Sequence, residues 1–316
     1  MTQPLAFLFP GQGSQSAGMG KELADKYPVA RDVFNEADAA LGYSLSELCF
    51  AGPDEKLKLT EITQPAILTV SVAAQRVLAE KGIKPQYVAG HSLGEYSAHV
   101  AAGTISFADA VRTVAKRGRY MQDAVPVGTG AMAAILALEL LALEAVCRQA
   151  QNETGGIVSP ANINSPDQIV ISGSRAAVER AAQLAKEKGA KRAVMLQVSA
   201  PFHCALMQPA QDRLAEDLRA LRFSNPQLPV VTNVDAEAVQ DADKARDALI
   251  RQVTGAVQWV RSVQSLIASG VQTFVEVGPG KVLTGLLRQI DRSKTGLNVE
   301  NEESLQKTVG ALGNRL

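Results

Sequence analysis

The stretch YVAGHSLGEYSAHV, residues 87–100, predicts the fold more directly than any other part of the chain. The apolar run at 87–90 is typical of a short buried strand, and the residues from 92 to 102 are typical of a helix. Between them, Gly90-His91-Ser92-Leu93-Gly94 fits G-x-S-x-G, in which a nucleophilic serine lies on a sharp turn from strand to helix. The pattern favours an α/β fold with Ser92 as a candidate nucleophile, although a purely structural turn would share it.

The same alternation of strand and helix continues on both sides of this turn. The apolar run LAFLF at 5–9 indicates a buried strand that stops at Pro10 and Gly11. Further elements are a helix over 64–81 that starts with a Pro and ends on a Gly, a helix over 106–124, and a strand in TFVEVGPGK at 273–281 that runs into a glycine turn. An α/β sheet of this kind carries its site at the C-terminal ends of the strands.

The middle of the chain has a different order of elements. After VPVGTG at 125–130 we expect an apolar strand at 131–138, a helix at 139–151, strands near 157–163 and at 168–172, a helix at 174–188 and a strand at 192–198. This β-α-β-β-α-β order is the ferredoxin-like arrangement. We therefore predict a large, discontinuous α/β-hydrolase-like domain formed by 1–127 and 200–316, with a small ferredoxin-like domain inserted at 128–199.

Composition agrees with a folded protein of this size. The chain has 316 residues, of which 46% are hydrophobic and 20% charged, and its formal net charge is zero. This length predicts roughly two domains, and the apolar content is too high for a disordered chain. A neutral chain offers no support for general binding to nucleic acid or to a membrane surface.

The cysteines and the apolar segments add little to this assignment. Cys49, Cys147 and Cys204 are scattered without a C-x-x-C pair, so we expect small buried side chains rather than a disulfide framework or a metal site. The N-terminal MTQPLAFLFPGQG has no basic region before its short apolar run, and the most apolar window, 131–147, carries two glutamates. We therefore expect a cytoplasmic protein without a signal peptide or membrane span.

A serine nucleophile needs a base, and the sequence has three histidines. His91 adjoins Ser92, and neighbouring side chains on a turn point apart. His99 lies seven residues into the helix, about 10 Å away along its axis, whereas a proton transfer needs about 3 Å. His203 is left by elimination, in a stretch that Pro201 interrupts and where we expect an exposed side chain. The first two histidines have structural alternatives: His91 would pack under the turn, and His99 would lie on a helix face.

Two other features have weaker claims to chemistry. Cys204 is a rival nucleophile, but it adjoins His203 and would face about 100° away from it on a helix. The loop FPGQGSQSAG at 9–18 misses the dinucleotide-binding pattern G-x-G-x-x-G, so a phosphate site is poorly supported there. A better use of the loop is to present the backbone N–H of Gln12 to the site beside Ser92.

Six stretches together resemble one protein family in order along essentially the whole chain. They are FPGQGSQ at 9–15, GHSLGEYSA at 90–98, RGRYMQ at 117–122, ANINSP at 161–166, PFHCALM at 201–207 and EVGPGKVLTGL at 276–286. They look like the malonyl-CoA:acyl carrier protein transacylases of bacterial fatty acid synthesis. Six motifs in the right order are far more specific than G-x-S-x-G alone.

The resemblance implies roles for individual residues. Ser92 would be the acylated nucleophile and His203 its base, while the N–H groups of Gln12 and Leu93 would form the oxyanion hole. The guanidinium of Arg117 would bind the malonyl carboxylate, for which its planar fork is suited.

Two further roles come from the same resemblance. Gln252 matches the residue that orients the histidine through its amide oxygen, although TGAVQW at 254–259 departs from the Pro-containing version common in the family. Phe202 resembles the bulky residue that leaves little room for an α-methyl branch, and a core role is equally compatible with it.

The implied function is transfer of malonyl from malonyl-CoA to the phosphopantetheine thiol of acyl carrier protein by a ping-pong mechanism. No metal or redox cofactor is expected, and we expect a monomer. Basic residues at 185–192, with Lys116 and Arg119, are candidates for docking the carrier protein, although they also suit a solvated face. The alternatives are a serine hydrolase or thioesterase, a polyketide-pathway acyltransferase, and a non-catalytic docking module.

Overall fold

Strand β1 (Leu5–Phe9) lies inside a six-stranded sheet with the order β10-β9-β1-β2-β7-β8. Its neighbours are β2 (Tyr87–Gly90) and β9 (Thr273–Val277), and the sheet continues through β7 (Val230–Val231), β8 (Ala238–Val239) and β10 (Thr295–Val299). Every neighbouring pair is parallel except β7 with β8. The computed structural model describes residues 4–313, so 1–3 and 314–316, the ends of the predicted large domain, lie outside the described residues.

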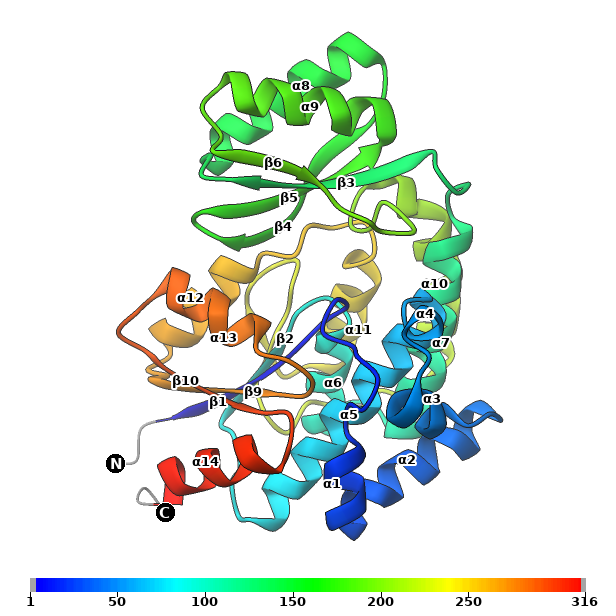
Figure 1. Ribbon diagram of the computed structural model, residues 1–316, viewed down its shortest axis with the longest axis vertical. Coiled ribbons are helices and arrows are strands. Elements are labelled where there is room, and N and C mark those ends of the chain that lie inside the picture. Colours follow the sequence, from blue (N-terminus) through cyan, green and yellow to red (C-terminus); the bar gives the residue numbers. More distant parts are fainter. Residues whose placement is uncertain (1–3, 314–316) are drawn as a thin grey trace.

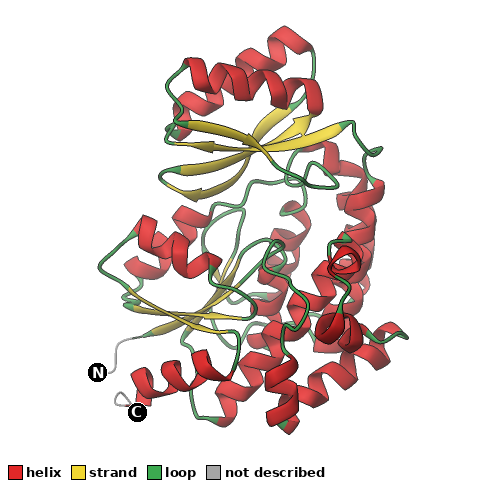
Figure 2. Cartoon of the chain, in the orientation of Figure 1, coloured by secondary structure: helices red, strands yellow, loops and turns green. Residues whose placement is uncertain are grey.

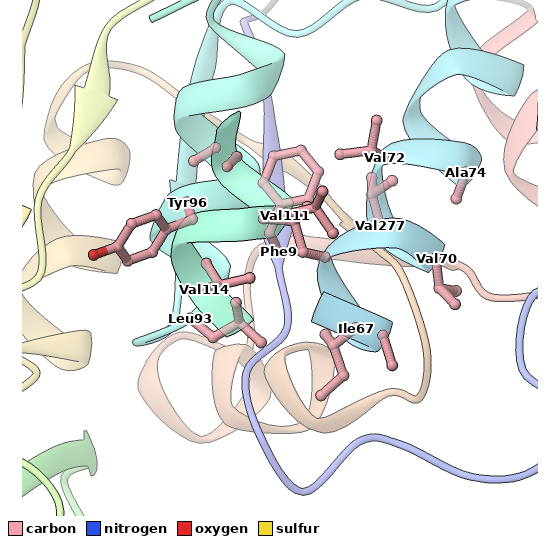
Figure 3. Close-up of a cluster of buried hydrophobic side chains, with 14 of the residues drawn as sticks. Phe9, Ile67, Val70, Val72, Ala74, Leu93, Tyr96, Val111, Val114 and Val277 are labelled. Carbon is pink, nitrogen blue, oxygen red and sulfur yellow. The ribbon is translucent and has the colours of Figure 1, made fainter. Parts of the chain in front are cut away.

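Both faces of this sheet are covered, which explains why β1 is apolar without alternation. Phe7 and Phe9 belong to one buried cluster, whereas Ala6 and Leu8 belong to another on the opposite face. Figure 3 shows the first cluster, in which Phe9 lies among side chains of the neighbouring helices. That face is covered by α5 (Thr60–Glu80) and α6 (Gly94–Ala101), on which α2 (Pro28–Leu41) and α7 (Phe107–Asp123) pack, and the other by α12 (Trp259–Ala268) and α13 (Val282–Ile290).

The remaining helices complete the surroundings of the large sheet. They are α1 (Lys21–Lys26), α3 (Leu45–Ala51), α4 (Asp54–Leu57), a 3₁₀ turn at Ala205–Met207, α10 (Gln208–Ala220), α11 (Ala242–Arg251) and α14 (Glu302–Gly313). Within the described part of the chain, none of the helices has the length and apolar content needed to cross a membrane.

A second sheet is built entirely from the middle of the chain. Its four antiparallel strands have the order β4-β5-β3-β6, with β3 (Gly130–Leu136), β4 (Val158–Ser165), β5 (Gln168–Ser174) and β6 (Arg192–Met195). Helices α8 (Leu140–Thr154) and α9 (Arg175–Glu187) cover the face that is turned away from the large sheet (Figures 1 and 2). The mixed α/β class with one mainly parallel and one antiparallel sheet is thereby confirmed.

The small sheet is joined to the rest of the molecule along β4. The N–H of Ile163 donates to the carbonyl of Val257 at 2.9 Å, and the N–H of Val257 donates to the carbonyl of Ala161 at 2.8 Å. These bonds fix β4 beside the segment that follows α11, so the small sheet forms one wall of the cleft described below.

One predicted element differs from the structure at its start. Helix α5 begins at Thr60, so Pro65 lies inside the helix and not at its first turn. The helix can start earlier because the carbonyl of Leu59 accepts from the N–H groups of Ile62 and Thr63 at 2.8 and 2.7 Å. Pro65 lacks an N–H and so cannot donate to the carbonyl of Glu61, at a position just beyond the first turn of the helix.

The turn between β2 and α6 depends on two glycines that have no room for a side chain. A Cβ on Gly94 would lie 2.0 Å from the carbonyl oxygen of Phe9, and one on Gly90 would lie 1.9 Å from the carbonyl oxygen of Gly94. The helix therefore starts in direct contact with the end of β1, and only glycine permits this approach.

We expect the Gly94→Ala substitution to lower the free energy of unfolding by about 2 kcal/mol or more, because backbone must move to admit the methyl group. The measurement is urea unfolding followed by circular dichroism. Gly285→Ala is the matched control: Gly285 lies in α13 with no atom within 4 Å of an added Cβ, so a gain of about 0.5–1 kcal/mol is expected. Equal unfolding midpoints for Gly94→Ala and the wild type would contradict the close approach.

Candidate active site

Ser92 lies at the turn between β2 and α6, in a conformation that few residues adopt. Its φ is 51°, in the left-handed region that disfavours side chains with a Cβ. The side chain of Asn233 fixes this turn from both sides: Oδ1 accepts from the Ser92 N–H at 2.6 Å, and Nδ2 donates to the Gly90 carbonyl at 2.6 Å. The turn thus holds the Ser92 hydroxyl out from the backbone toward the cleft.

His203 is the histidine that reaches this hydroxyl. Its Nε2 lies 2.7 Å from Ser92 Oγ, and its Nδ1 lies 2.9 Å from the main-chain carbonyl oxygen of Gln252. Because the carbonyl can only accept, Nδ1 carries the proton and Nε2 is left to accept the proton of Ser92. The structure brings together the serine and the histidine that elimination selected.

The surroundings of His203 differ from the exposed position that the sequence suggested. The side chain is 3% exposed, and its φ of 60° is also in the left-handed region. Burial, together with the positive charge of nearby Arg117, lowers the pKa of His203 to about 3. The imidazole is therefore neutral at neutral pH, as a proton acceptor must be.

Arg117 reaches Ser92 from α7 and is buried there without a direct ion pair. Nη2 lies 3.2 Å from Ser92 Oγ and donates to Gln252 Oε1 at 2.9 Å, while Nη1 donates to Gln64 Oε1 at 2.8 Å. Within residues 4–313 the guanidinium, in a side chain only 1% exposed, forms no ion pair with a carboxylate. Burial lowers the pKa of Arg117, yet an arginine stays charged in proteins. The cleft therefore contains a positive charge that no carboxylate contacts directly, while the buried carboxylate of Glu95 interacts with it electrostatically.

Gln252 touches both His203 and Arg117, but with different atoms from those we expected. The main-chain carbonyl orients His203, whereas the side-chain oxygen accepts from Arg117. The side-chain Nε2 donates to the main-chain oxygen of Ser92 at 2.9 Å and to Glu95 Oε2 at 2.8 Å. Gln252 is thus central to the site, and its side chain is engaged with the arginine and the serine turn.

Gln12 and Leu93, the residues of the expected oxyanion hole, both lie beside Ser92. Gln12 lines the cleft, and a Cβ on the preceding Gly11 would lie 2.5 Å from the His91 carbonyl oxygen, so this loop passes close to the serine turn. Among the hydrogen bonds of residues 4–313, none comes from the main-chain N–H of Gln12 or of Leu93. Both groups are therefore free to donate to a ligand.

The cleft lies between the two sheets and is lined from both. Phe202 and Met121 contribute apolar surface from the large side, and Met132, Val170 and Leu196 from the small side. It adjoins a second cavity that shares Gln12, His91 and Asn162 and is also lined by apolar residues of α13.

The other histidines do not contact the Ser92 hydroxyl. His91 Nε2 lies 2.8 Å from Asn164 Oδ1, and its ring packs 5.4 Å from that of Trp259. His99 is fully buried, where its Nδ1 lies 3.2 Å from Thr104 Oγ1. Cys204 is buried, and its thiol donates to the carbonyl of Pro201.

Three residues of the site were missed by the sequence analysis: Gln64, Glu95 and Asn233. Each is buried and polar, and each hydrogen-bonds a residue already named. Glu95 directly follows G-x-S-x-G, and Gln64 interrupts an apolar helix, which are the only signals available. A polar residue in an apolar segment becomes informative once its partner is known.

Comparison with known proteins places these residues in a family. A family model described as an acyl transferase domain matches residues 6–311. The malonyl CoA-acyl carrier protein transacylase of Escherichia coli strain K12 is 54% identical over 291 residues, which are 92% of this chain and 93% of the relative. The protein of that name from Bacillus subtilis strain 168 is 49% identical over 308 residues, covering 98% and 97% of the two chains.

Solved structures agree with this assignment. The malonyl CoA-acyl carrier protein transacylase of Coxiella burnetii has a TM-score of 0.96 and 46% sequence identity, covering 99% of this chain and 98% of the other. A malonyl-transacylase solved in complex with a type II PKS acyl-carrier protein has a TM-score of 0.94 and 48% identity, covering 98% and 99%.

The depressed pKa of His203 predicts how the reactivity of Ser92 depends on pH. His203 accepts a proton only when neutral, so reactivity is lost as the pH falls through the folded-state pKa, below the ordinary 6.5. We expect the rate of Ser92 modification by a fluorophosphonate to stay constant from about pH 8 to about pH 5. Circular dichroism at each pH verifies that the protein is folded, and Ser92→Ala is the control for site-specific labelling. An inflection at or above pH 6.5 would contradict the environment assigned to His203.

Proposed function

The chain belongs to the malonyl CoA-acyl carrier protein transacylases of the acyl transferase family, and we propose that it transfers malonyl from malonyl-CoA to the phosphopantetheine thiol of acyl carrier protein. The chain is thus an acyltransferase. The observation that carries the choice of acyl group is Arg117, a buried guanidinium without a carboxylate partner, 3.2 Å from Ser92 Oγ. An acyl group with a free carboxylate supplies the missing negative charge.

In the first half-reaction, Ser92 Oγ attacks the thioester carbonyl carbon while His203 Nε2 takes the hydroxyl proton. The carbonyl oxygen becomes an oxyanion that accepts from the main-chain N–H groups of Gln12 and Leu93. Collapse of this intermediate breaks the carbon–sulfur bond, and the coenzyme A thiolate leaves with the proton held by His203. The free N–H groups and the 2.7 Å contact between Ser92 and His203 support this sequence.

The second half-reaction reverses the steps of the first, with the phosphopantetheine thiol of acyl carrier protein in place of coenzyme A. The phosphopantetheine thiol gives its proton to His203 and attacks the malonyl-serine carbonyl, and the Ser92 oxygen then leaves and regains the proton. The main-chain carbonyl of Gln252 keeps His203 oriented throughout through its contact with Nδ1. These steps use only side chains and main-chain groups of the protein and need no metal or redox cofactor.

Arg117 would hold the malonyl carboxylate in a fixed direction from the serine. Gln64 and Gln252 accept from its two terminal nitrogens and so fix the plane of the guanidinium. An acetyl group would leave that charge without a partner, which is a basis for selectivity. Phe202 lines the same cleft, and its ring would restrict an α-methyl branch.

Several wider assignments belong to the same proposal. The larger part, 1–127 with 200–316, is proposed as an α/β-hydrolase-like domain and 128–199 as an inserted ferredoxin-like domain. The order β4-β5-β3-β6, with helices on one face only, supports the second assignment. A cytoplasmic location, a monomeric state and carrier-protein docking at Lys116, Arg119 and 185–192 stay predictions; Lys116 already pairs with Asp217 at 2.7 Å.

The acyl-enzyme gives the most direct test of this function. We expect mass spectrometry after mixing with malonyl-CoA to find one malonyl group on the peptide that contains Ser92, and none in Ser92→Ala. Added holo acyl carrier protein should remove the group and carry it, whereas a hydrolase or thioesterase would release free malonate. An unmodified Ser92 peptide would exclude the proposed enzyme and favour the non-catalytic docking module. Parallel reactions with acetyl-CoA and methylmalonyl-CoA test the role of Phe202.

Replacement of Arg117 tests the choice of acyl group. We expect Arg117→Ala to reduce the rate of malonylation of Ser92 by about a hundredfold, because a charge-assisted bidentate contact is lost, and acetylation by much less. Arg112→Ala is the matched control, since Arg112 lies on the same helix and is largely exposed in a surface pair with Asp109. Malonylation at the wild-type rate in Arg117→Ala would show that another group binds the carboxylate.

A further inference from the structure

Glu95 is a buried carboxylate directly behind the serine turn, in the first turn of α6. One of its oxygens, Oε2, accepts two hydrogen bonds: from the Gln252 side-chain Nε2 at 2.8 Å and from the main-chain N–H of Asn233 at 3.0 Å. The other oxygen, Oε1, has no hydrogen-bond partner among residues 4–313. No step of the mechanism above uses this carboxylate.

The contact with Gln252 fixes which end of that amide faces Arg117. Nε2 donates toward Glu95 and the Ser92 carbonyl, so Oε1 points to Arg117 Nη2 at 2.9 Å. In the flipped amide, the NH₂ group would face another donor and the oxygen would face two acceptors. Glu95 and Arg117 therefore require the same orientation from opposite ends of one amide.

The contact with Asn233 acts on the serine turn. The main chain of Asn233 is held by Glu95, and its side chain bonds the Ser92 N–H and the Gly90 carbonyl. Glu95 thus reaches the main chain of Ser92 through Asn233 and the guanidinium of Arg117 through Gln252.

We propose that Glu95 is a positioning residue that sets the preference for a malonyl over an acetyl group by holding the Gln252 amide against Arg117. The inference rests on the proposed function. Glu95 touches no reacting atom and acts through Gln252, with a second effect on the serine turn through Asn233.

The contacts favour the acceptor oxygen over the charge as the functional feature of Glu95, and the electrostatic interaction of that charge with Arg117 is the alternative that E95Q tests. Both donors converge on Oε2, whereas nothing donates to Oε1. His99 Nε2 lies 3.9 Å from Oε1, and burial lowers the pKa of His99 to about 3, so that neighbour is neutral. Burial also raises the pKa of Glu95 to about 7. A proton on Oε1 leaves both contacts of Oε2 intact.

Two substitutions separate the acceptor from the charge. E95Q keeps the arm length and an acceptor oxygen for both donors but removes the charge, whereas E95D keeps the charge and withdraws the oxygens by one methylene. The readout is the ratio of Ser92 acylation rates with malonyl-CoA and acetyl-CoA. We expect this ratio to fall about tenfold in E95D, which corresponds to the loss of the hydrogen bond between Gln252 and the charged guanidinium of Arg117. In E95Q we expect the ratio to stay within about twofold of wild type, because that hydrogen bond is kept.

The ratio distinguishes this role from a structural one. General loosening of the serine turn slows both substrates and leaves the ratio unchanged, whereas release of Arg117 slows malonyl selectively. If E95D does not fold, Glu95→Met takes its place, since it fills the same space without an acceptor and should lower the ratio likewise.

Three results would overturn the proposal. They are a wild-type ratio in E95D (or in Glu95→Met, where that variant replaces it), a lowered ratio in E95Q, or an equal fall of the two acylation rates in E95D. Failure of the wild-type enzyme to transfer malonyl would instead overturn the proposed function. The two failures are therefore distinguishable in one set of measurements.

Discussion

The buried charge of Arg117 is the constraint on which the site depends. Leaving a buried charge without a partner costs about 3–5 kcal/mol in proteins, and here two neutral amide oxygens, from Gln64 and Gln252, supply only part of the compensation. Gln64 can reach Arg117 because α5 and α7 pack closely: a Cβ on Gly118 would lie 2.5 Å from the Thr60 carbonyl oxygen. The glycine beside Arg117 therefore contributes to the site by bringing the two helices together.

The arrangement of the two sheets turns these fixed groups into a cleft. The serine turn, the loop at Gln12 and the helix of Arg117 all belong to the side of the large sheet, and the small sheet closes the opposite wall. In Figure 3 the Tyr96 ring lies at the edge of the apolar cluster with its hydroxyl directed away from it, and the Arg117 guanidinium lies 5.6 Å from the centre of that ring. The apolar core thus ends where the polar site begins, so the site is built directly on the buried core.

The sequence predicted the site residues that either lie in a recognisable motif or belong to a residue type with few copies in the chain. Ser92 was found because glycines on both sides of a turn are a specific pattern, and His203 because the chain has three histidines and two were excluded by distance or direction. Arg117 and Gln252 came from family resemblance alone, since nothing in their local spacing marks them. Glu95 and Asn233 were missed because their roles lie in contacts across 138 or more positions, which no local pattern encodes. The predicted start of α5 was wrong because Pro65 was taken as the mark of a helix start, whereas the helix begins at Thr60 and contains the proline.

The buried charge of Arg117 also explains why the partner of His203 is a neutral carbonyl, that of Gln252, and not a carboxylate. A carboxylate at the position of the Gln252 carbonyl would raise the pKa of His203, but it would also offer Arg117 a permanent counter-ion and compete with the carboxylate of a substrate. The carbonyl orients the imidazole without that competition. Because Arg117 contributes to the low pKa of His203, a malonyl carboxylate paired with Arg117 would offset that effect and make His203 a stronger base. Under the proposed function, the substrate that the site selects would therefore also strengthen the base that deprotonates Ser92.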